Sequence, residues 1–229
     1  MAADHAKLLA QPPQIEDADA LRTDLDLYDL FGAEDGFDLD DPAAEDALFE
    51  GQDASYTQGR GAELNGCILR RCNLRGLRWH KASFTDVVFE NCDLSNSRFY
   101  EAYFQRVRFV GCKLVGTDAV DALLRNVTFE DSLLRMLNLS GAKLTGVTFT
   151  DCDLTESSLR MLQEMKRVAL TRCDLTRAEL TNTRLKGLDL TTCQLQGLQL
   201  TGAPELNGAY VSPDQAIQLS SLLGVILKP

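Results

Sequence analysis

The sequence predicts an all-β protein, a four-sided parallel β-helix that is followed by a short C-terminal α-helix. Two observations lead to this fold class. A large apolar residue recurs every fifth residue over about 150 of the 229 residues, and small residues recur every twenty residues. A period of five matches neither the 3.6-residue period of an α-helix nor the two-residue period of a strand. The chain must therefore turn a corner every five residues, and four such turns close one coil.

The large apolar residues occupy what we call the central positions, because they should fill the middle of each coil. Eighteen of the twenty central positions in residues 64–159 are Leu or Phe. The exceptions are Trp79 and Ala119, where we expect a local swelling and a local pinch. One additional residue interrupts the period before residues 170–200, and a second precedes Leu206. Both interruptions fall on the same side of the square and are each predicted to form a bulge, while a partner-contacting role for residues 161–165 stays open.

The residues two before the central positions are small and form columns along the helix. One column consists of Ala62, Ala82, Ala102, Ala122 and Ala142, and another of Cys72, Cys92, Cys112, Ser132, Cys152, Cys173 and Cys193. Parallel coils stack about 4.8 Å apart, so that each side can point one large and one small side chain inward. Because serine takes a cysteine position, these thiols are predicted to pack in the core and to stay reduced.

Charged residues are distributed unevenly between the N-terminal 54 residues and the rest of the chain. Residues 1–54 contain 16 acidic residues against Lys7 and Arg22, whereas residues 55–229 contain 18 acidic and 21 basic residues. We therefore predict three parts: an acidic N-terminal segment (1–54) that is partly disordered or capping, the β-helix (55–211), and a C-terminal helix and tail (212–229).

Two stretches can be distinguished within the acidic segment. Residues 19–31 are expected to form a short helix with Leu21, Leu25 and Tyr28 on one side. The run 34–50 is predicted to be a solvated acidic segment, in which Ala47 and Phe49 hint at a frayed first coil. It can fold back on the nearest basic residues, which are Arg70, Arg71, Arg75, Arg78 and Lys81.

The C-terminal element begins with a capping box at residues 212–215, with proline at the first helical position. Leu219, Leu222 and Leu223 give this helix an apolar face, and Gly224 is placed where a helix would stop. The face is predicted to cover the last coil. Because the same face can pair with a second copy, the three leucines are also the candidate dimer contact.

Residues that catalysis requires are scarce. The only histidines are His5 and His80, so the chain offers few candidates for the histidine base that a Ser-His or Cys-His nucleophile requires. The sequence contains no GxxxxGK[ST] phosphate loop, no GxGxxG after a strand and no CxxC pair at zinc spacing. We expect no catalytic, cofactor-binding or metal-binding residues, and a protein that is not an enzyme.

The sequence also indicates where the protein is located in the cell and which classes of partner it can bind. Residues 1–13 contain no apolar run typical of a signal peptide, and no stretch approaches the roughly 18 apolar residues of a membrane span. We therefore expect a cytoplasmic protein without membrane contact. The net charge of −11 argues against direct binding to nucleic acid, because phosphates would repel the chain.

The five-residue period, with its A(D/N)LXX-like repeats such as residues 93–96 and 138–141, resembles the pentapeptide-repeat family. This resemblance implies a right-handed quadrilateral parallel β-helix. The length and the C-terminal helix resemble the quinolone-resistance branch of that family, whose members are rod-like dimers with acidic flanks that bind DNA gyrase. In that branch a C-terminal helix of this kind forms the dimer contact.

The resemblance implies a non-enzymatic DNA mimic that binds DNA gyrase or topoisomerase IV, modulates quinolone sensitivity and forms a homodimer through its C-terminal helix. The candidate partner-binding residues are acidic and are predicted to stack along one corner: Glu90, Asp93, Glu130, Asp131, Asp151, Asp153 and Asp174. Arg70, Arg71, Lys113 and Arg172 interrupt that corner. The alternative is an interaction scaffold whose partner is unrelated to topoisomerases.

Overall fold

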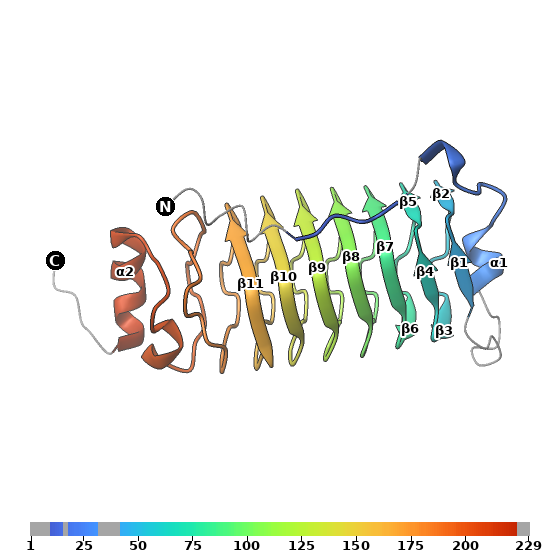
Figure 1. Cartoon of the computed structure of the whole chain (residues 1–229). Helices are drawn as coiled ribbons and strands as arrows, with labels where there is room; N and C mark the ends of the chain where they lie inside the picture. Colours follow the sequence, from blue (N-terminus) through green and yellow to red (C-terminus); the bar gives the residue numbers. More distant parts are fainter. Residues whose placement is uncertain (1–9, 16–17, 32–41, 224–229) are drawn as a thin grey trace.

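The computed structural model describes residues 10–15, 18–31 and 42–223, which form a rod of stacked parallel strands (Figure 1). The longest ladder joins β1 (Ala43–Glu45), β4 (Glu63–Asn65), β7 (Ser83–Glu90), β8 (Tyr103–Val110), β9 (Leu123–Glu130), β10 (Lys143–Thr150) and β11 (Glu164–Thr171). Beside it, β2 (Leu48–Glu50) pairs with β5 (Ile68–Arg70), β5 pairs with β7, and β3 (Gln58–Arg60) pairs with β6 (Arg78–His80). The predicted parallel β-solenoid with a short C-terminal helix is confirmed.

The register of the ladder reproduces the sequence periods. Phe84 pairs with Phe104, twenty residues on, and the same interval joins the strands from β4 to β10. Between β10 and β11 the interval is 21 residues, since Leu144 pairs with Met165. A second 21-residue interval pairs Asp189 with Tyr210. Both additional residues follow the same column of the coil, in agreement with the prediction that they fall on the same side of the square.

Stacked aromatic rings occupy the centre of the rod. Phe89, Phe109, Phe129 and Phe149 lie one above another on successive coils, with ring centroids 4.8 or 4.9 Å apart and planes within 4° of parallel. This spacing is the distance between neighbouring strands, so the backbone ladder places each ring directly on the next. Every fifth residue points inward because the chain turns after each short side.

The corners require a left-handed backbone, with positive φ at one residue in every five through most of the rod. Glycine, Asn and Asp tolerate this conformation best, which explains their frequency at these positions. At Gly66 a Cβ atom would lie 2.2 Å from Asp46 Oδ1, and at Gly141 it would lie 2.2 Å from Asp121 Oδ1. These two glycines therefore make room for an aspartate side chain from the coil below.

The seven cysteines are buried and free. Each thiol donates a hydrogen bond to a backbone carbonyl, as from Cys92 Sγ to Leu69 O at 3.3 Å. Burial raises the pKa of the Cys67 thiol to about 11. The thiols thus act as small core residues.

The solenoid begins earlier in the chain than residue 55, where the sequence analysis places its start. Ala43 pairs with Glu63 and Leu48 with Ile68, so the first coil begins within the acidic segment. Three of its four central positions are small, namely Ala44, Ala54 and Gly59. Because Phe49 is the one large apolar residue among these four positions, the sequence gives only a hint of this coil.

A short helix fills the space that these small residues leave. Helix α1 (Leu27–Phe31) buries Leu27 and Phe31 against the first coil, and the Phe31 ring centroid lies 4.7 Å from that of Trp79. Trp79 fits without distorting the coil because it lies over Gly59, whose Cβ would be 3.7 Å from the indole. The expectation of a helix through residues 19–31 with Tyr28 on its apolar side is wrong, since Tyr28 is exposed.

Residues 10–15 and 18–22 run along the outside of the rod (Figure 1), and we call them the N-terminal arm. Figure 1 shows it crossing β7, β8 and β9. The Gln14 backbone N–H donates a 2.7 Å hydrogen bond to Asp86, and Ile15 packs with Leu21 on the outward side chains of Ile68 and Val88. After the 3₁₀ turn η2 (Ala18–Ala20), Arg22 pairs with Ala47 at the end of the ladder. The part of the predicted acidic run in residues 32–41 lies outside the described residues.

Ala119 leaves a cavity of about 20 Å³ instead of the predicted pinch. The cavity is lined by apolar side chains, among them Phe99, Phe129 and Leu139. The Ala119 N–H donates to Asn138 O at 2.8 Å, so the ladder holds the backbone at the same spacing as elsewhere. The backbone at Ala119 therefore cannot move inward to close the cavity.

The C-terminal end is closed by η3 (Ala203–Leu206), α2 (Pro213–Leu219) and η4 (Ser220–Leu223). The predicted capping box is present: Ser212 Oγ accepts from Gln215 N at 3.2 Å, and Gln215 Oε1 accepts from Ser212 N at 2.7 Å. Leu219 joins the main core, which confirms the expected cover over the last coil. Within the described residues, no helix has the length and apolarity needed to cross a bilayer.

Candidate functional site

The structure brings the seven predicted acidic residues to one corner of the rod, which we call the acidic corner. Glu90 and Glu130 end β7 and β9, and both occupy the same column of the ladder. Asp93, Asp153 and Asp174 belong to a second column, two residues further round the turn. The remaining members, Asp131 and Asp151, occupy the left-handed positions between the two columns. The corner follows the C-terminal ends of the strands, along the upper edge of the rod in Figure 1.

Arginines neutralise part of this corner. Arg70 Nε lies 2.6 Å from Glu90 Oε2, and Arg172 contacts Asp151 through two hydrogen bonds of 2.5 and 2.6 Å. The hydrogen bond from Arg172 lowers the pKa of Asp151. The pairs are between a third and three fifths exposed, so each is screened by solvent and adds little stability.

Two further arginines that the sequence analysis did not single out also reach the corner. Arg108 lies 3.3 Å from Glu130, and Arg135 lies 3.8 Å from Asp153. The signal in the sequence is the twenty-residue period, because these pairs are separated by 22 and 18 residues and hence lie on adjacent coils. Among the described residues, Asp93, Asp131 and Asp174 form no salt bridge.

Aspartates of the corner also hold its backbone. Asp93 Oδ1 accepts from the Ser95 N–H at 3.0 Å, and Asp174 Oδ1 accepts from the Thr176 N–H at 2.8 Å. Asp153 makes the same contact with Thr155 N. These carboxylates stabilise the turn after the corner in the manner of Asx turns.

Two of the three leucines predicted as a dimer contact pack against the core. Leu219 is buried in the main core, and Leu222 is half-buried against it. The side chain of Leu223 lies outside the part that the structure describes. Among the described residues at this end, the exposed large apolar side chains are Ile217, with 57% of its surface accessible, and Tyr210, with 62%.

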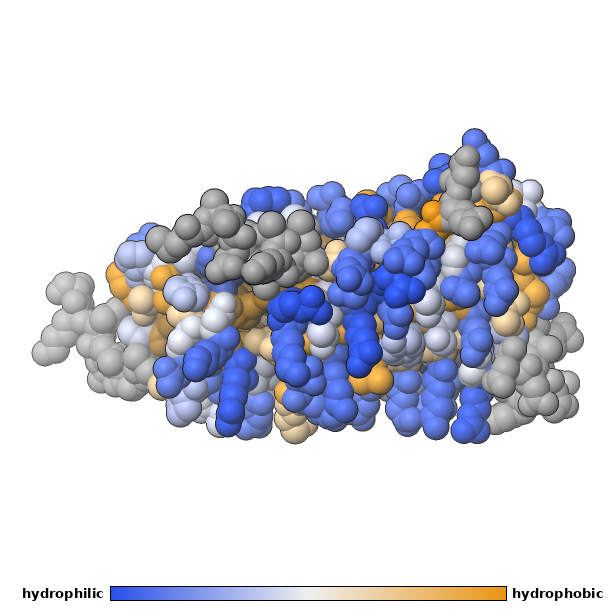
Figure 2. Space-filling model, in the orientation of Figure 1, coloured by the Kyte–Doolittle hydropathy of each residue, from blue (hydrophilic) through white to orange (hydrophobic). Residues whose placement is uncertain are grey.

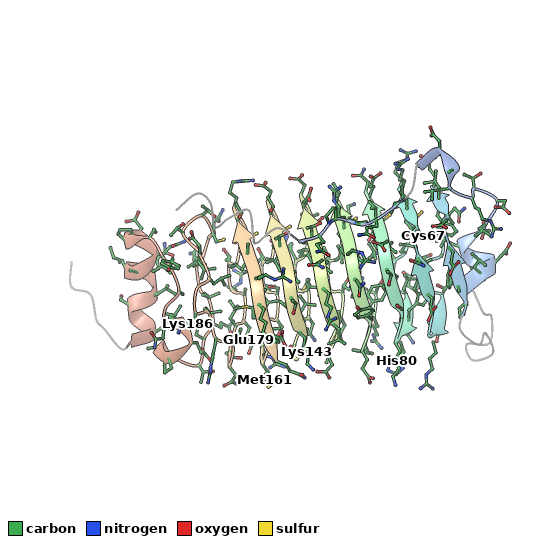
Figure 3. All side chains as sticks on the ribbon, viewed as in Figure 1. Cys67, His80, Lys143, Met161, Glu179 and Lys186 are labelled. Carbon is green, nitrogen blue, oxygen red and sulfur yellow. The ribbon has the colours of Figure 1, made fainter. Side chains whose placement is uncertain are left out.

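The segment around the first bulge is mostly incorporated into the sheet. Glu164 and Met165 belong to β11, and Glu164 accepts a hydrogen bond from Thr145 and pairs with Lys166 at 2.9 Å. Met161 remains half exposed at the corner, where Figure 3 shows it on the lower edge of the rod. Over the described ranges, no cluster of three or more His, Cys, Asp or Glu side chains is arranged to hold a metal ion.

Comparison with solved structures finds several rods of low sequence similarity. HetL, from the cyanobacterium Nostoc sp. strain PCC 7120 and involved in heterocyst differentiation regulation, is 18% identical over 74% of this chain and 89% of its own, with a TM-score of 0.41. Full-length QnrB1, a plasmid-mediated fluoroquinolone resistance protein, is 15% identical over 80% of this chain and 100% of its own, with a TM-score of 0.34. Similarities this low carry no argument about function.

A third rod, Rfr23 from the cyanobacterium Cyanothece 51142, is 13% identical over 74% of this chain and 88% of its own, with a TM-score of 0.20. No curated protein sequence matches the chain. Two family models do match: "Pentapeptide repeat region" over residues 82–159 and "Pentapeptide repeats (8 copies)" over residues 170–203. Together with the four-sided ladder, these matches show that the chain belongs to the pentapeptide-repeat family.

Proposed function

We propose that this protein works without catalysis, by presenting the acidic corner to a protein that otherwise binds DNA, with DNA gyrase or topoisomerase IV as the partner. The observation that carries the proposal is the alignment of carboxylates from four of five successive coils along one edge. A rod with one anionic edge offers a DNA-binding groove a row of negative charges at fixed positions. Electrostatic complementarity of this kind steers association and sets specificity.

The proposed site of action is the cytoplasm, where gyrase is present. Binding there would modulate quinolone sensitivity, because the drug acts on the same enzyme. Asp93, Asp131 and Asp174 are the residues that we assign to the partner contact first, since none of the described basic side chains pairs with them. Glu90, Glu130, Asp151 and Asp153 contribute less, because each faces an arginine.

We also propose a homodimer through the C-terminal end. The buried Leu219 and half-buried Leu222 would form the base of that end, and Ile217 and Tyr210 would contact the second copy. Two rods joined end to end would double the length of the acidic edge. Homodimers most often form by a two-fold contact of the same surface on both copies, which suits a single terminal cap.

A second candidate function is an interaction scaffold with a partner unrelated to topoisomerases. The ion pairs at the corner favour it, because four of the seven carboxylates have an arginine within 4 Å. Pentapeptide-repeat solenoids are in general structural or interaction proteins, so both candidates agree on the mode of action. They differ only in the partner.

A supercoiling assay with purified gyrase, with and without a fluoroquinolone, distinguishes the two functions. The parent protein should inhibit supercoiling or protect the enzyme from the drug, and the triple variant Asp93→Lys, Asp131→Lys, Asp174→Lys should not. The matched control reverses three exposed acids elsewhere: Glu45, Glu63 and Asp214. If neither gyrase nor topoisomerase IV responds to micromolar parent protein, the topoisomerase proposal fails and the scaffold stands.

A further inference from the structure

A group of basic side chains on another side of the rod has no role in the acidic corner. Arg60 on β3, Arg78 on β6 and Arg98 on the next coil point outward from one side of the square, and Arg75 lies at the adjoining corner. We call these four residues the basic face. In Figure 3 the label of His80, which follows Arg78 by two residues, marks this region near the N-terminal end of the rod.

All four arginines of the basic face are exposed, and none forms a salt bridge with a described residue. Other outward arginines of this rod do find a carboxylate one coil away, as Arg70 does with Glu90 and Arg177 with Glu156. Two described carboxylates lie at the edge of the face: Glu101, which is 3.5 Å from both His80 and Lys81, and Asp118, which follows Arg98 in the same column. The basic face is therefore a cationic surface whose guanidinium donors are not engaged in a salt bridge by any residue that the structure describes.

The geometry of the face is fixed by the ladder. Arg78 pairs with Arg98 in the backbone, and Arg60 pairs with His80, so the cations stand on three successive coils about 4.8 Å apart. The face thus spans about 10 Å along the rod. Guanidinium groups donate forked hydrogen bonds that suit carboxylates and phosphates.

We propose that the basic face is a docking surface for a short acidic segment of a partner protein, bound through its carboxylates. The extent of the face decides against a nucleic acid. Beyond Arg98, the outward positions of the same column are Asp118, Asn138, Ser158 and Glu179. A phosphate backbone that followed the rod would leave the cations after about 10 Å and meet Asp118, within a chain of net charge −11.

A peptide segment with two to four carboxylates is short enough to contact the basic face alone, so Asp118 does not repel it. Tyr100 closes the face on the side of Asp118, since its hydroxyl donates a 2.8 Å hydrogen bond to Asp118 Oδ2. That contact occupies the nearest acid of the column. Arg60, Arg78 and Arg98 lie on a side of the square that does not adjoin the acidic corner, so the two surfaces can engage different partners at once.

Fluorescence anisotropy with a labelled octapeptide of alternating glutamate and serine tests the proposal on the full chain. We expect binding in 50 mM salt that weakens at least tenfold in 300 mM salt, because exposed charges are screened. The double variant Arg78→Glu, Arg98→Glu should lower the affinity at least tenfold, and Arg78→Lys, Arg98→Lys should retain most of it. Circular dichroism and the melting temperature verify that each variant is folded.

The matched control is Arg125→Glu, Arg184→Glu, which reverses two exposed arginines that also form no salt bridge among the described residues but lie on other sides of the coil. It should bind the peptide like the parent. Three results would overturn the proposal: no binding by the parent at 100 μM protein, an equal loss in the control variant, or tighter binding of an oligothymidylate of equal charge that also depends on Arg78 and Arg98. The last result would make the face a phosphate site.

Discussion

The side-chain amide of Gln215 donates a 2.7 Å hydrogen bond to the backbone carbonyl of Leu190, one coil below the C-terminal helix. The same nitrogen donates to Cys193 O at 2.7 Å, while the amide oxygen accepts from Ser212 N. An open coil ends in carbonyls without partners, and one buried glutamine satisfies two of them. At the other end, Gln52 makes the equivalent contacts with the backbone of Leu25 and Leu27.

Gln215→Met should lower the free energy of unfolding by about 1 to 3 kcal/mol, because it leaves buried carbonyls unsatisfied while keeping the size of the side chain. Thermal unfolding followed by circular dichroism measures the change. Gln196→Met is the control, since Gln196 is exposed. Equal melting temperatures for the two variants would contradict a sealing role for Gln215.

Phe104→Ala should lower the free energy of unfolding by about 3 to 5 kcal/mol. The ring of Phe104 is 5% exposed and stacks on that of Phe84 with centroids 4.8 Å apart, so its removal leaves a cavity in the centre of the rod. Thr145→Ala, on the outside of β10, should change stability by less than about 0.5 kcal/mol. Chemical denaturation of both variants makes the comparison, and similar midpoints would refute the inward placement of the central positions.

Ala119→Val should raise the melting temperature, because the added methyl groups fill the existing cavity of about 20 Å³. The expected gain is about 0.5 to 2 kcal/mol. Ala122→Val is the matched control: Ala122 is fully buried and does not line the cavity, so the larger side chain should destabilise the fold by about 1 to 3 kcal/mol. Calorimetry that found the same sign of change for both would show that the cavity does not accept the added volume.

Asp86→Asn should detach the N-terminal arm and destabilise the fold at neutral pH. Asp86 and Arg106 form a largely buried pair with contacts of 2.5 and 2.6 Å, and Asp86 also accepts from Gln14 N. Breaking such a pair costs about 3 kcal/mol, since Arg106 loses its only described carboxylate. Hydrogen exchange at the Gln14 amide should accelerate in the variant, whereas Asp131→Asn should leave it unchanged.

The same contact should depend on pH. Burial opposes ionisation of Asp86, but the hydrogen bonds from Arg106 and Gln14 outweigh it and lower the pKa of this carboxyl in the folded state. A lowered pKa stabilises the fold above the unfolded value of about 3.9, and this contribution is lost as the pH falls through the folded value. The stability difference between the parent and Asp86→Asn should therefore shrink below about pH 4. A constant difference between pH 7 and pH 3 would contradict it.

Ile217→Lys should convert the proposed dimer into a monomer without lowering the melting temperature of the monomer. Ile217 is 57% exposed on the outside of the cap, so a lysine there costs little within one chain but would place two charges in a two-fold interface. Light scattering at micromolar concentration measures the mass. A parent protein that is already monomeric under these conditions would refute the proposed contact.

The sequence determined the architecture by itself, because the five-residue and twenty-residue periods reflect the geometry of a single repeating unit. A large side chain at every fifth position can be buried only if the chain turns between them, which leaves few alternatives. The bulges on one side of the square were visible as breaks in this period. The capping box at Ser212 was visible as a local sequence motif. The carboxylates of the acidic corner could be aligned from the period alone.

Only the tertiary structure decided how the ends are closed and which charges remain free. Phe31 fills the first coil where Gly59 leaves room under Trp79. Phe31 and Trp79 are far apart in the sequence, so no local sequence pattern predicts their contact. Arg108 and Arg135 reach the acidic corner from adjacent coils, so the pairing depends on side-chain direction as well as on register. The period in the sequence specifies the column of each residue, whereas the ion pairs and the end caps arise from contacts between columns and across the open coils.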